Sequence, residues 1–264
     1  MKKRIRCKDT KLSIIIVNYK TDGLILDLLS GITPDPSIET VIVDNSPKNI
    51  LEKKLPKRHD LHYFFANSNL GFSGGNNLGI SKAKGEWLFL LNSDTLTNTK
   101  DILRLLSITV KNNKVVSCPK LVQPGGVVQN NIGYFDKFIK NPINFIFARP
   151  RLIDCKRIST NTKADMLTGA AMLVHRSVFD KIGLLDDKNF FMYFEDIDFS
   201  YRLHKSGIGV LYCPSISITH LGGASSDQDT RQKNKNYQHG LQSYLKKHRG
   251  SLISWINNIF HFLS

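Results

Sequence analysis

Short runs of continuously apolar residues alternate with amphipathic stretches through the first hundred positions of the chain. Residues 11–19 (KLSIIIVNY) and 39–46 (ETVIVDNS) are rich in β-branched residues and end in polar ones. This pattern is typical of strands that are buried on both faces of a parallel sheet. Residues 61–68 (LHYFFANS) and 86–94 (EWLFLLNSD) follow it with aromatic residues, and we predict a strand in each.

Two helices are predicted between these strands. Residues 21–32 (TDGLILDLLSGI) and 73–85 (SGGNNLGISKAKG) have helical spacing, and Gly85 is expected to close the second helix. Regular alternation of strand and helix predicts an α/β fold. We expect an open, twisted, mostly parallel sheet of Rossmann type, flanked by helices, with ligands at the carboxyl ends of its strands.

The alternation of apolar and polar stretches becomes irregular between about 123 and 163, where adjacent glycines, several prolines and many basic residues indicate an insertion. Order returns at 164–186, which is predicted to form a strand with small residues and then a helix. A helix at 197–207 and a strand at 208–220 follow. The sequence contains no internal repeat or low-complexity segment.

Polar side chains follow each of the four strands predicted in the first hundred residues. One polar strand end is ordinary turn chemistry, but four at the same edge of a sheet favour a ligand crevice. The residues at these ends are Asn18, Tyr19, Asp44, Asn45, Asn67, Asn69, Asn92, Ser93 and Asp94.

Charge and cysteine content narrow the class of protein. The 264 residues include 37 Lys and Arg against 22 Asp and Glu, a formal charge of +15 that favours a polyanionic partner. Four scattered cysteines without a C-x-x-C pair predict reduced thiols in the cytoplasm. No run approaches the roughly 18 apolar residues of a membrane span, and the basic start lacks a cleavage site. We therefore expect a soluble or peripheral cytoplasmic protein.

Residues 69–80 (NLGFSGGNNLGI) place four glycines at the mouth of a predicted helix. Glycine permits close backbone approach, and a helix N-terminus attracts phosphate groups. The spacing fits neither the dinucleotide fingerprint nor the P-loop. A tight structural turn therefore stays an alternative to a phosphate site.

Four polar residues at strand ends have a chemistry of their own. Asp44 can accept hydrogen bonds from a nucleobase or ribose, or it can form an Asx turn. Asn92 and Asp94 lie two residues apart on one face and offer oxygen ligands to a hard divalent cation that bridges a diphosphate. His220 ends the last predicted strand and can add a nitrogen ligand.

Three acids, Glu195, Asp196 and Asp198, stand directly behind an aromatic run (NFFMYF). An apolar wall excludes water and raises the basicity of a carboxylate, which is what a general base requires. Asp198 and Arg202 are four residues apart on a predicted helix and can form an ion pair, which makes Asp198 structural. Glu195 is expected to orient or cap.

Six segments together resemble family 2 glycosyltransferases of GT-A fold, and among them the rhamnosyltransferase branch of O-antigen and cell-wall synthesis. The resemblance extends from about residue 12 to 223. The segments are SIIIVNY, VIVDNS, NLGFSGGNNLGI, WLFLLNSDT, the run from LTGAAMLVH to FEDIDFSYRLHKSG, and ITHLGG.

The resemblance implies a role for each of the candidate residues. Asp196 would be the general base, and Asp94, with His220, would hold Mg²⁺ or Mn²⁺ on the diphosphate of a sugar nucleotide. Asn92 stands where many relatives have aspartate, which weakens the hold on the cation. Glu195, Asp198 and Arg202 would support the base. The residues that would bind the nucleotide are Asn18, Tyr19, Asp44, Asn45, Gly71, Gly74, Asn77, Asn92 and Ser93.

The same resemblance implies an organisation and a substrate. Residues 1–223 would form the GT-A domain, with a nucleotide-binding half at about 12–97 and an acceptor half at about 164–223. Rhamnose, from dTDP-L-rhamnose, would pass to a polyprenyl-diphosphate-linked saccharide. A different UDP- or dTDP-sugar donor is an alternative.

The last segment, 224–264, is basic and amphipathic. Its end (KKHRGSLISWINNIFHFLS) joins a cationic cluster to apolar residues at near-helical spacing. It either lies on an anionic membrane, at the inner face of the cell membrane, or packs onto the domain.

Two other functions are less well supported by the sequence. A sugar nucleotidyltransferase would need a glycine-rich loop that binds a triphosphate near the N-terminus, and this sequence does not provide one. A nucleic-acid-binding module is disfavoured because the basic residues are dispersed along the chain.

Overall fold

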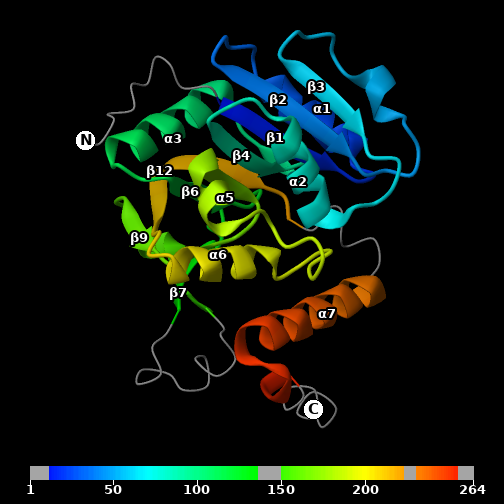
Figure 1. The fold of residues 1–264 in the computed structure, drawn as a ribbon. Helices are drawn as coiled ribbons and strands as arrows, with labels where there is room; N and C mark the ends of the chain where they lie inside the picture. The colour runs from blue at the N-terminus through cyan, green and yellow to red at the C-terminus, as the bar shows by residue number, and fades with distance from the viewer. Residues whose placement is uncertain (1–11, 136–149, 223–229, 255–264) are drawn as a thin grey trace.

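A computed structural model describes residues 12–135, 150–222 and 230–254 of the chain (Figure 1). Its centre is a mixed sheet whose main path runs β3-β2-β1-β4-β11-β6-β12-β5, with β9 paired to β12. The first four strands in this order are parallel to one another. They are β1 (Leu12–Asn18), β2 (Ile38–Asp44), β3 (Leu61–Phe65) and β4 (Trp87–Asn92).

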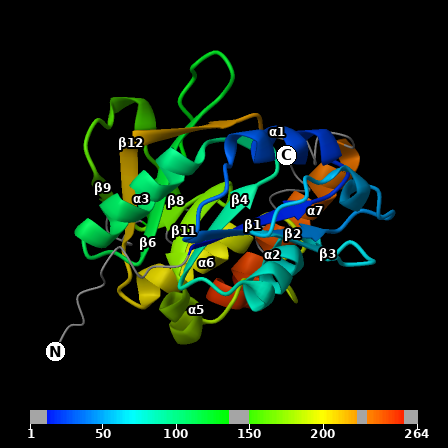
Figure 2. The same ribbon diagram turned by 90° about the horizontal axis from the view of Figure 1, so that it is seen from above.

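Alternate side chains of β1 enter two different cores, which explains its continuous apolar sequence. Ile14 and Ile16 pack with helices α1 (Asp22–Gly31) and α3 (Thr99–Lys111). Ile15 points to the opposite face, which α2 (Gly71–Lys82), α5 (Arg176–Ile182) and α6 (Glu195–Lys205) cover. Figure 2 shows these two groups of helices on opposite sides of the sheet. The predicted α/β sheet with helical layers is therefore confirmed.

The helix α2 ends earlier than its sequence pattern predicts. It stops at Lys82, and Gly85 lies beyond it with its amide donating to Ser13 Oγ at 2.8 Å. The guanidinium of Arg176 donates to the carbonyl oxygens of Ile80, Ala83 and Gly85 at 2.7 to 3.3 Å. Because this one side chain satisfies the terminal carbonyls, the helix needs no glycine cap.

The second half of the chain continues the same sheet. The strand β11 (Ala171–His175) is antiparallel to both β4 and β6 (Val116–Val122), and β12 (Val210–His220) is parallel to β6. The short strand β5 (Thr95–Leu96) pairs with the end of β12, so that His220 lies opposite Thr95. This pairing brings the polar end of β4 next to the end of β12.

The region predicted as an insertion is partly ordered. Within its described residues, β7 (Ile132–Phe135) and β8 (Pro150–Leu152) form a separate three-stranded sheet together with β10 (Met166–Leu167), which follows the region. The 3₁₀ turn Cys155–Arg157 and β9 (Thr162–Ala164) follow β8, and a second 3₁₀ turn, Leu51–Lys54, lies between β2 and β3. The few apolar residues of the region still reach the core, since Ile132 and Cys155 are buried.

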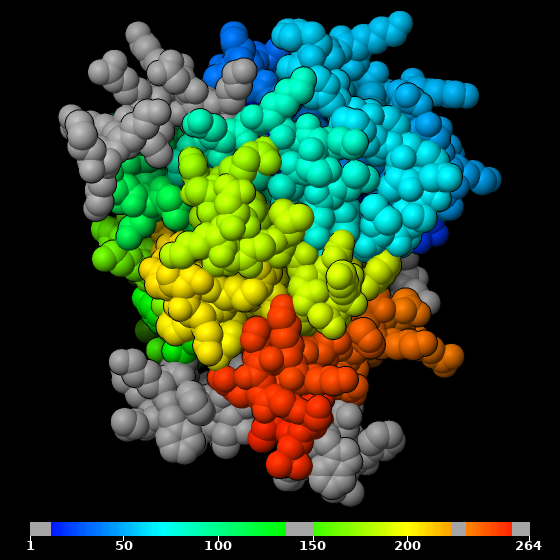
Figure 3. All heavy atoms as spheres, in the orientation of Figure 1, coloured from blue at the N-terminus to red at the C-terminus, as the bar shows by residue number. Residues whose placement is uncertain are grey.

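The C-terminal helix α7 (Thr230–Arg249) packs on α6 through a third core cluster. Figure 3 shows α7, in orange and red, lying against α6 in yellow and the loop that precedes it. The buried members of this cluster are Phe190, Phe194, Tyr201, Leu241, Tyr244 and Leu245. Within the segment predicted as a membrane anchor or a packed helix, α7 is therefore packed on the domain, whereas Leu252 is 67% exposed and residues 224–229 and 255–264 lie outside the described part, so membrane attachment stays a prediction.

Among the described residues, no helix combines the length and the apolar character that crossing a bilayer requires.

Candidate functional site

Two cavities meet at the carboxyl end of β4. The first has a volume of about 460 Å³ and the second about 380 Å³. They share four lining residues, Phe72, Asn92, Asp94 and Met192, which form the wall between them. A third cavity of about 360 Å³ lies beside the first and shares Lys20 with it. The predicted crevice at the strand ends is thus a chain of three adjoining cavities.

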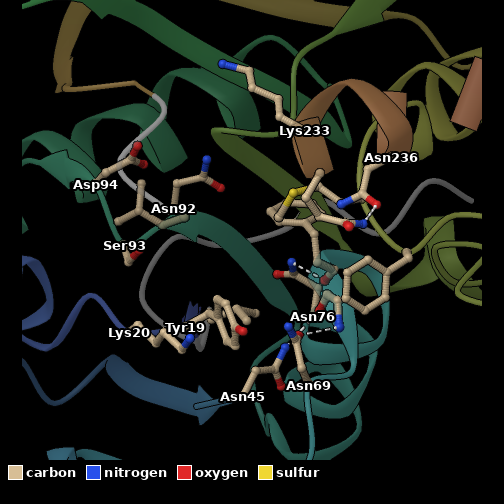
Figure 4. A pocket seen from close by; sticks show the side chains of 17 residues that line it. Tyr19, Lys20, Asn45, Asn69, Asn76, Asn92, Ser93, Asp94, Lys233 and Asn236 are labelled. Atoms are coloured by element: carbon tan, nitrogen blue, oxygen red, sulfur yellow. Dashed lines mark hydrogen bonds between the residues drawn. The ribbon is translucent and has the colours of Figure 1, made fainter. Parts of the chain in front are cut away.

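The first cavity is lined by six of the residues predicted to bind the nucleotide or the metal. Its floor comes from the ends of β1, β2 and β4, and Figure 4 shows Asn92, Ser93 and Asp94 side by side on one wall. The six residues are Tyr19, Asn45, Gly71, Asn92, Ser93 and Asp94. The Oδ1 atom of Asn45 is buried without a hydrogen-bond partner, although its amide nitrogen donates to the carbonyl of Gly71 at 2.9 Å.

Gly71 is required by geometry at the start of α2. Its φ is +72°, and a Cβ there would lie 2.2 Å from the carbonyl oxygen of Phe191. The next amide, that of Phe72, donates to the same oxygen at 2.8 Å. The start of α2 is therefore held against the loop before α6, and both segments line the first cavity.

Asn18 and Asp44 do not line any of the three cavities but fix the loops that do. The carboxylate of Asp44 accepts from Asn18 at 2.9 Å, from Tyr63 at 2.8 Å and from the amide of Ser46 at 2.9 Å. Ser46 lines the third cavity. Recognition of a base by Asp44 stays a prediction, and in this structure its carboxylate positions Ser46.

Two other predicted nucleotide-binding residues lie away from the cavities. The side chain of Asn77 donates to the carbonyl of Leu185 at 2.7 Å and accepts from the amide of Leu185 at 3.2 Å. A Cβ on Gly74 would contact Leu70 and Asp187. Both residues join α2 to the loop before α6, and their part in donor binding stays a prediction.

Asp94 and His220 face each other, and Gln129 fixes the imidazole. Nε2 of His220 lies 3.5 Å from Oδ1 of Asp94, and Nδ1 lies 2.7 Å from Oε1 of Gln129. Nε2 of Gln129 donates to the backbone carbonyl of His220 at 3.4 Å, which sets the orientation of the amide. Because an amide oxygen only accepts, Nδ1 carries a hydrogen. With its hydrogen on Nδ1, His220 directs Nε2 toward Asp94, which is the arrangement of a histidine that ligates a metal through Nε2.

The donor atoms around Asp94 fit a hard divalent cation. Asn92 Oδ1 is buried without a hydrogen-bond partner, and it lines both cavities together with the carboxylate of Asp94. The described residues contain no cluster of three or more His, Cys, Asp and Glu side chains that could hold a metal. One carboxylate, one amide oxygen and one imidazole leave positions for phosphate oxygens and water, which is how Mg²⁺ is usually bound at phosphate sites.

A strained turn aims the acidic residues at the second cavity. Tyr193 and Phe194 have φ values of 70° and 69°, in the left-handed region that aromatic residues rarely occupy. Such residues each cost about 1–3 kcal/mol and gather at functional sites. The helix α6 begins at Glu195 rather than at the predicted residue 197, so Glu195 and Asp196 lie in its first turn and line the second cavity.

Asp196 is held by backbone amides and not by a cation. Oδ2 accepts from the amide of Gly169 at 2.9 Å, and Oδ1 accepts from that of Ile197 at 2.8 Å. Burial raises the pKa of Asp196, and the amides oppose this rise. Burial, reinforced by the charge of Asp196, raises the pKa of Glu195 well above the usual range. The raised pKa favours the protonated form of Glu195, while the amides favour the anionic form of Asp196.

Asp198 is the structural acid of the three, with no exposed surface. Its carboxylate contacts Arg202 at 2.8 Å, which confirms the predicted pair, and it also contacts Lys247 and His248 of α7 at 2.7 Å each. Burial opposes its ionisation, but the hydrogen bond from His248 and the charges of Arg202 and Lys247 lower the pKa to about 2. Asp198 therefore stays ionised and ties α7 to α6.

Several residues that line the cavities could not be predicted from the pattern of apolar and polar positions. Gln129, Asn130 and Asn131 reach the second cavity from the region predicted as an insertion, where the polar run QNN was the available hint. Gln232, Lys233 and Asn236 reach the first cavity from α7. On a helix such residues resemble an ordinary solvated face, and only the packing of α7 shows where they point.

A family model described as "Glycosyl transferase family 2" matches residues 13–183. The low-salt glycan biosynthesis hexosyltransferase Agl10 of Haloferax volcanii is 33% identical over 214 residues, 79% of this chain and 66% of its own length. The rhamnosyltransferase WbbL of Escherichia coli is 23% identical over 217 residues, 78% of this chain and 82% of its own. The chain thus spans slightly under two thirds of the first of these relatives.

Solved structures share the fold at low sequence identity. The crystal structure of GalNAc-T7 with UDP, GalNAc and Mn²⁺ superimposes with a TM-score of 0.68 and 18% identity, over 90% of this chain and 48% of that one. The mannosyltransferase PcManGT of Pyrobaculum calidifontis, in complex with GDP-Man and Mn²⁺, has a TM-score of 0.60 and 14% identity, over 90% of this chain and 64% of that one.

Proposed function

Since this chain belongs to glycosyl transferase family 2 and has the GT-A fold, we propose that it transfers L-rhamnose from dTDP-L-rhamnose to a polyprenyl-diphosphate-linked saccharide. The similarity to WbbL supports the choice of sugar. A shorter match supports the acceptor: an N-acetylglucosaminyl-diphospho-decaprenol L-rhamnosyltransferase of Mycobacterium tuberculosis is 33% identical over 90 residues, 34% of this chain and 27% of its own length. Such a step belongs to the synthesis of O-antigen or another cell-surface polysaccharide.

The observation that carries the proposal is the shared wall of the two cavities. Asn92 and Asp94 face both, and Asp196 lies only in the second. A donor diphosphate in the first cavity and an acceptor hydroxyl in the second would meet at this wall. The donor's base would occupy the third cavity, beside Ser46. Donor and acceptor are thereby given separate places with one point of contact.

The proposed reaction is a direct displacement with inversion. Asp196 accepts the proton of the acceptor hydroxyl as its oxygen forms a bond to the anomeric carbon of the donor. The bond from that carbon to the diphosphate oxygen breaks, and dTDP leaves with the electron pair. A single base and a stabilised leaving group are sufficient, because no covalent enzyme intermediate forms. A glycosidase would instead place two carboxylates on either side of the bond.

A divalent cation, Mg²⁺ or Mn²⁺, would be held by Asp94, His220 and the amide oxygen of Asn92, and would offset the charge of the departing diphosphate. The donor set supports this part of the proposal, since Nε2 of His220 lies 3.5 Å from Oδ1 of Asp94 and the buried Oδ1 of Asn92, which has no hydrogen-bond partner, belongs to a residue of the same cavity wall. Gln129 would keep Nε2 of His220 in place.

The test is transfer to a defined acceptor. The purified chain is incubated with N-acetylglucosaminyl-diphospho-polyprenol and, in turn, dTDP-L-rhamnose, UDP-hexoses and GDP-mannose, and the lipid is analysed by mass spectrometry. A mass gain of one deoxyhexose with dTDP-L-rhamnose alone is expected, and it should disappear in the Asp196→Asn variant. Transfer of a hexose from another donor, as the name of Agl10 suggests, would reject the rhamnose assignment but keep the reaction class.

The acceptor and the charge suggest where the protein works. A polyprenyl-linked substrate lies at the membrane, and a chain of formal charge +15 is attracted to anionic lipid headgroups. We therefore place the protein in the cytoplasm at the inner face of the cell membrane, as a peripheral protein.

A further inference from the structure

The helix α7 forms a wall of the first cavity, opposite the strand ends. Gln232, Lys233 and Asn236 line the cavity from this helix, whereas Lys235 is exposed and lies outside it. Spacings of three and four residues place Asn236 on the same helical face as Lys233 and Gln232. One face of the first turns of α7 therefore belongs to the cavity that the proposed function assigns to the sugar nucleotide.

The position of this wall is fixed by the other half of the helix. Leu241, Tyr244 and Leu245 are buried against α6 and the loop before it. Lys247 also contacts Asp186 at 2.7 Å, in addition to its contact with Asp198. A Cβ on Gly240 would lie 2.7 Å from the carbonyl oxygen of Tyr193, so the two backbones touch there. The C-terminal half anchors α7, and the N-terminal half presents polar groups to the cavity.

The charges around the cavity are suited to a diphosphate. Of the described residues that line it, two carry a positive charge: Lys20 at the end of β1 and Lys233 on α7. Figure 4 shows Lys233 extending from α7 across the cavity on the side of Asn92 and Asp94. Its half-buried position reduces the screening of its charge by water. An ammonium group at this place borders the first cavity on the side where Asn92 and Asp94 lie.

We propose that Lys233 is a donor-binding residue whose ammonium pairs with the diphosphate of the sugar nucleotide, which makes α7 a permanent part of the donor site. The inference rests on the proposed function, because it requires a nucleoside diphosphate sugar in the first cavity. Gln232 and Asn236, which hydrogen-bond to each other at 2.8 Å, line the same cavity from the same helix. The helix α7 is then part of the active site and not only an accessory to the domain.

The experiment measures the affinity for dTDP and for thymidine by calorimetry in the presence of Mn²⁺. Lys233→Gln removes the ammonium, and Lys235→Gln is the matched control, because it removes the same charge from an exposed position of the same helix. Lys233→Gln should weaken dTDP binding about 10- to 100-fold, the range for a lost hydrogen bond between charged groups. Thymidine binding should not change, and Lys233→Arg should restore most of the affinity for dTDP.

Two results would overturn the inference, and they differ from each other. If the wild-type chain binds dTDP and Lys233→Gln binds it as well as Lys235→Gln does, Lys233 has no role, while the proposed function stands. If the wild-type chain binds none of the three nucleotides dTDP, UDP and GDP, the proposed function fails and the inference fails with it. Equal melting temperatures of the three variants exclude misfolding as the cause of a lost affinity.

Discussion

Glu195 and Asp196 are adjacent acids in one cavity, and their surroundings assign them different states. Asp196 receives two backbone amides, whereas Oε2 of Glu195 is buried without a partner. Their neighbour Asp198 is bound by Arg202, Lys247 and His248. The three carboxylates behind the aromatic run therefore have three environments: Glu195 is buried with one oxygen unpaired, Asp196, the proposed base, is held by amides, and Asp198 ties α7 to α6.

We expect Asp196→Asn to lower the transfer rate by about 10²- to 10⁴-fold, because the amide cannot accept the acceptor's proton. The binding of dTDP should be unchanged. Glu195→Gln is the control, since the raised pKa of Glu195 favours its protonated form, which an amide resembles in size and hydrogen-bonding capacity, and it should leave the rate within a few-fold of wild type. Rates are measured with the folded variants across pH. The wild-type rate should fall as the pH drops through the raised pKa of Asp196, above the usual 3.8.

A second expectation at this scale concerns Gln129. Gln129→Leu removes the oxygen that holds the hydrogen on Nδ1 of His220, so the imidazole can turn its lone pair away from Asp94. The affinity for Mn²⁺ in the presence of dTDP should fall about 10- to 100-fold, as is common when such supporting partners are lost. Electron paramagnetic resonance of free Mn²⁺ gives this affinity without any assay of transfer.

Gln129→Glu is the informative comparison, because it keeps an oxygen that accepts from Nδ1 and should retain the affinity for Mn²⁺. Equal Mn²⁺ affinity in wild type and Gln129→Leu would show that Gln129 does not orient His220 for a metal.

At the scale of elements, the contact between α6 and α7 depends on Asp198. Its pKa is lowered from 3.8 to about 2, so it stabilises the folded state above its ordinary pKa, and this contribution is lost as the pH falls toward 2. Roughly two pKa units correspond to about 2 kcal/mol. Urea unfolding between pH 5 and 2 should therefore show a loss of about this size that Asp198→Asn no longer shows.

The control for this measurement is Asp154→Asn, which breaks an exposed pair with Arg157 and should change the unfolding free energy by less than about 1 kcal/mol. At neutral pH, Asp198→Asn should destabilise the fold by about 2–5 kcal/mol, because it leaves buried cations without their partner. If both variants unfold alike, Asp198 is not the anchor of α7.

The close approach at Gly240 gives an independent way to move the same helix. Gly240→Ala places a methyl group 2.7 Å from the carbonyl of Tyr193 and 3.1 Å from the ring of Phe194, so α7 must shift away from α6. We expect a lower melting temperature and weaker dTDP binding. Gly23→Ala, on α1, meets no atom within 4 Å and should be neutral or slightly stabilising. A Gly240→Ala chain with wild-type melting temperature and affinity would contradict the assigned packing.

The sequence predicts the strands of this fold better than it predicts the site. Strands such as β1 and β4 are buried on both faces, and so their apolar runs are unmistakable. The start of α6 is missed because Glu195 and Asp196 look like loop residues until the turn at Phe194 places them in a helix. The residues of α7 are missed because a polar helical face looks the same whether it borders solvent or a cavity.

At the scale of the whole molecule, the main sheet runs through both parts of the predicted division into a nucleotide half at 12–97 and an acceptor half at 164–223. The strands β4 and β11 belong to different halves yet pair directly along five residues, from Ala171 to His175. The wall between the proposed donor and acceptor cavities therefore lies where the two halves are joined by direct pairing of their strands and not by a linker. The division remains a description of ligand sites and not of separate bodies.

Membrane attachment is also a property of the whole molecule. The full chain should sediment with vesicles that contain anionic lipid more than with neutral ones, and salt should weaken this binding. Lys247, His248 and Arg249 already contact groups of α6, so the attraction must come from other cations or from the residues that follow. Removal of the residues after Arg249 should reduce sedimentation if they form the anchor. Unchanged sedimentation would assign them to packing on the domain.

The order of elements along the chain has a consequence for synthesis. Every other described wall of the first cavity is complete by residue 192, but Gln232, Lys233 and Asn236 are made later. The anchor of α7 is later still, at 241–248. A nascent chain on the ribosome can therefore fold its sheet and cover both faces while the donor cavity stays open on one side. We therefore expect the protein to retain a sugar nucleotide only after about residue 248 has left the exit tunnel, because a chain that ends before α7 lacks one wall of the proposed donor site and the packing of α7 on α6.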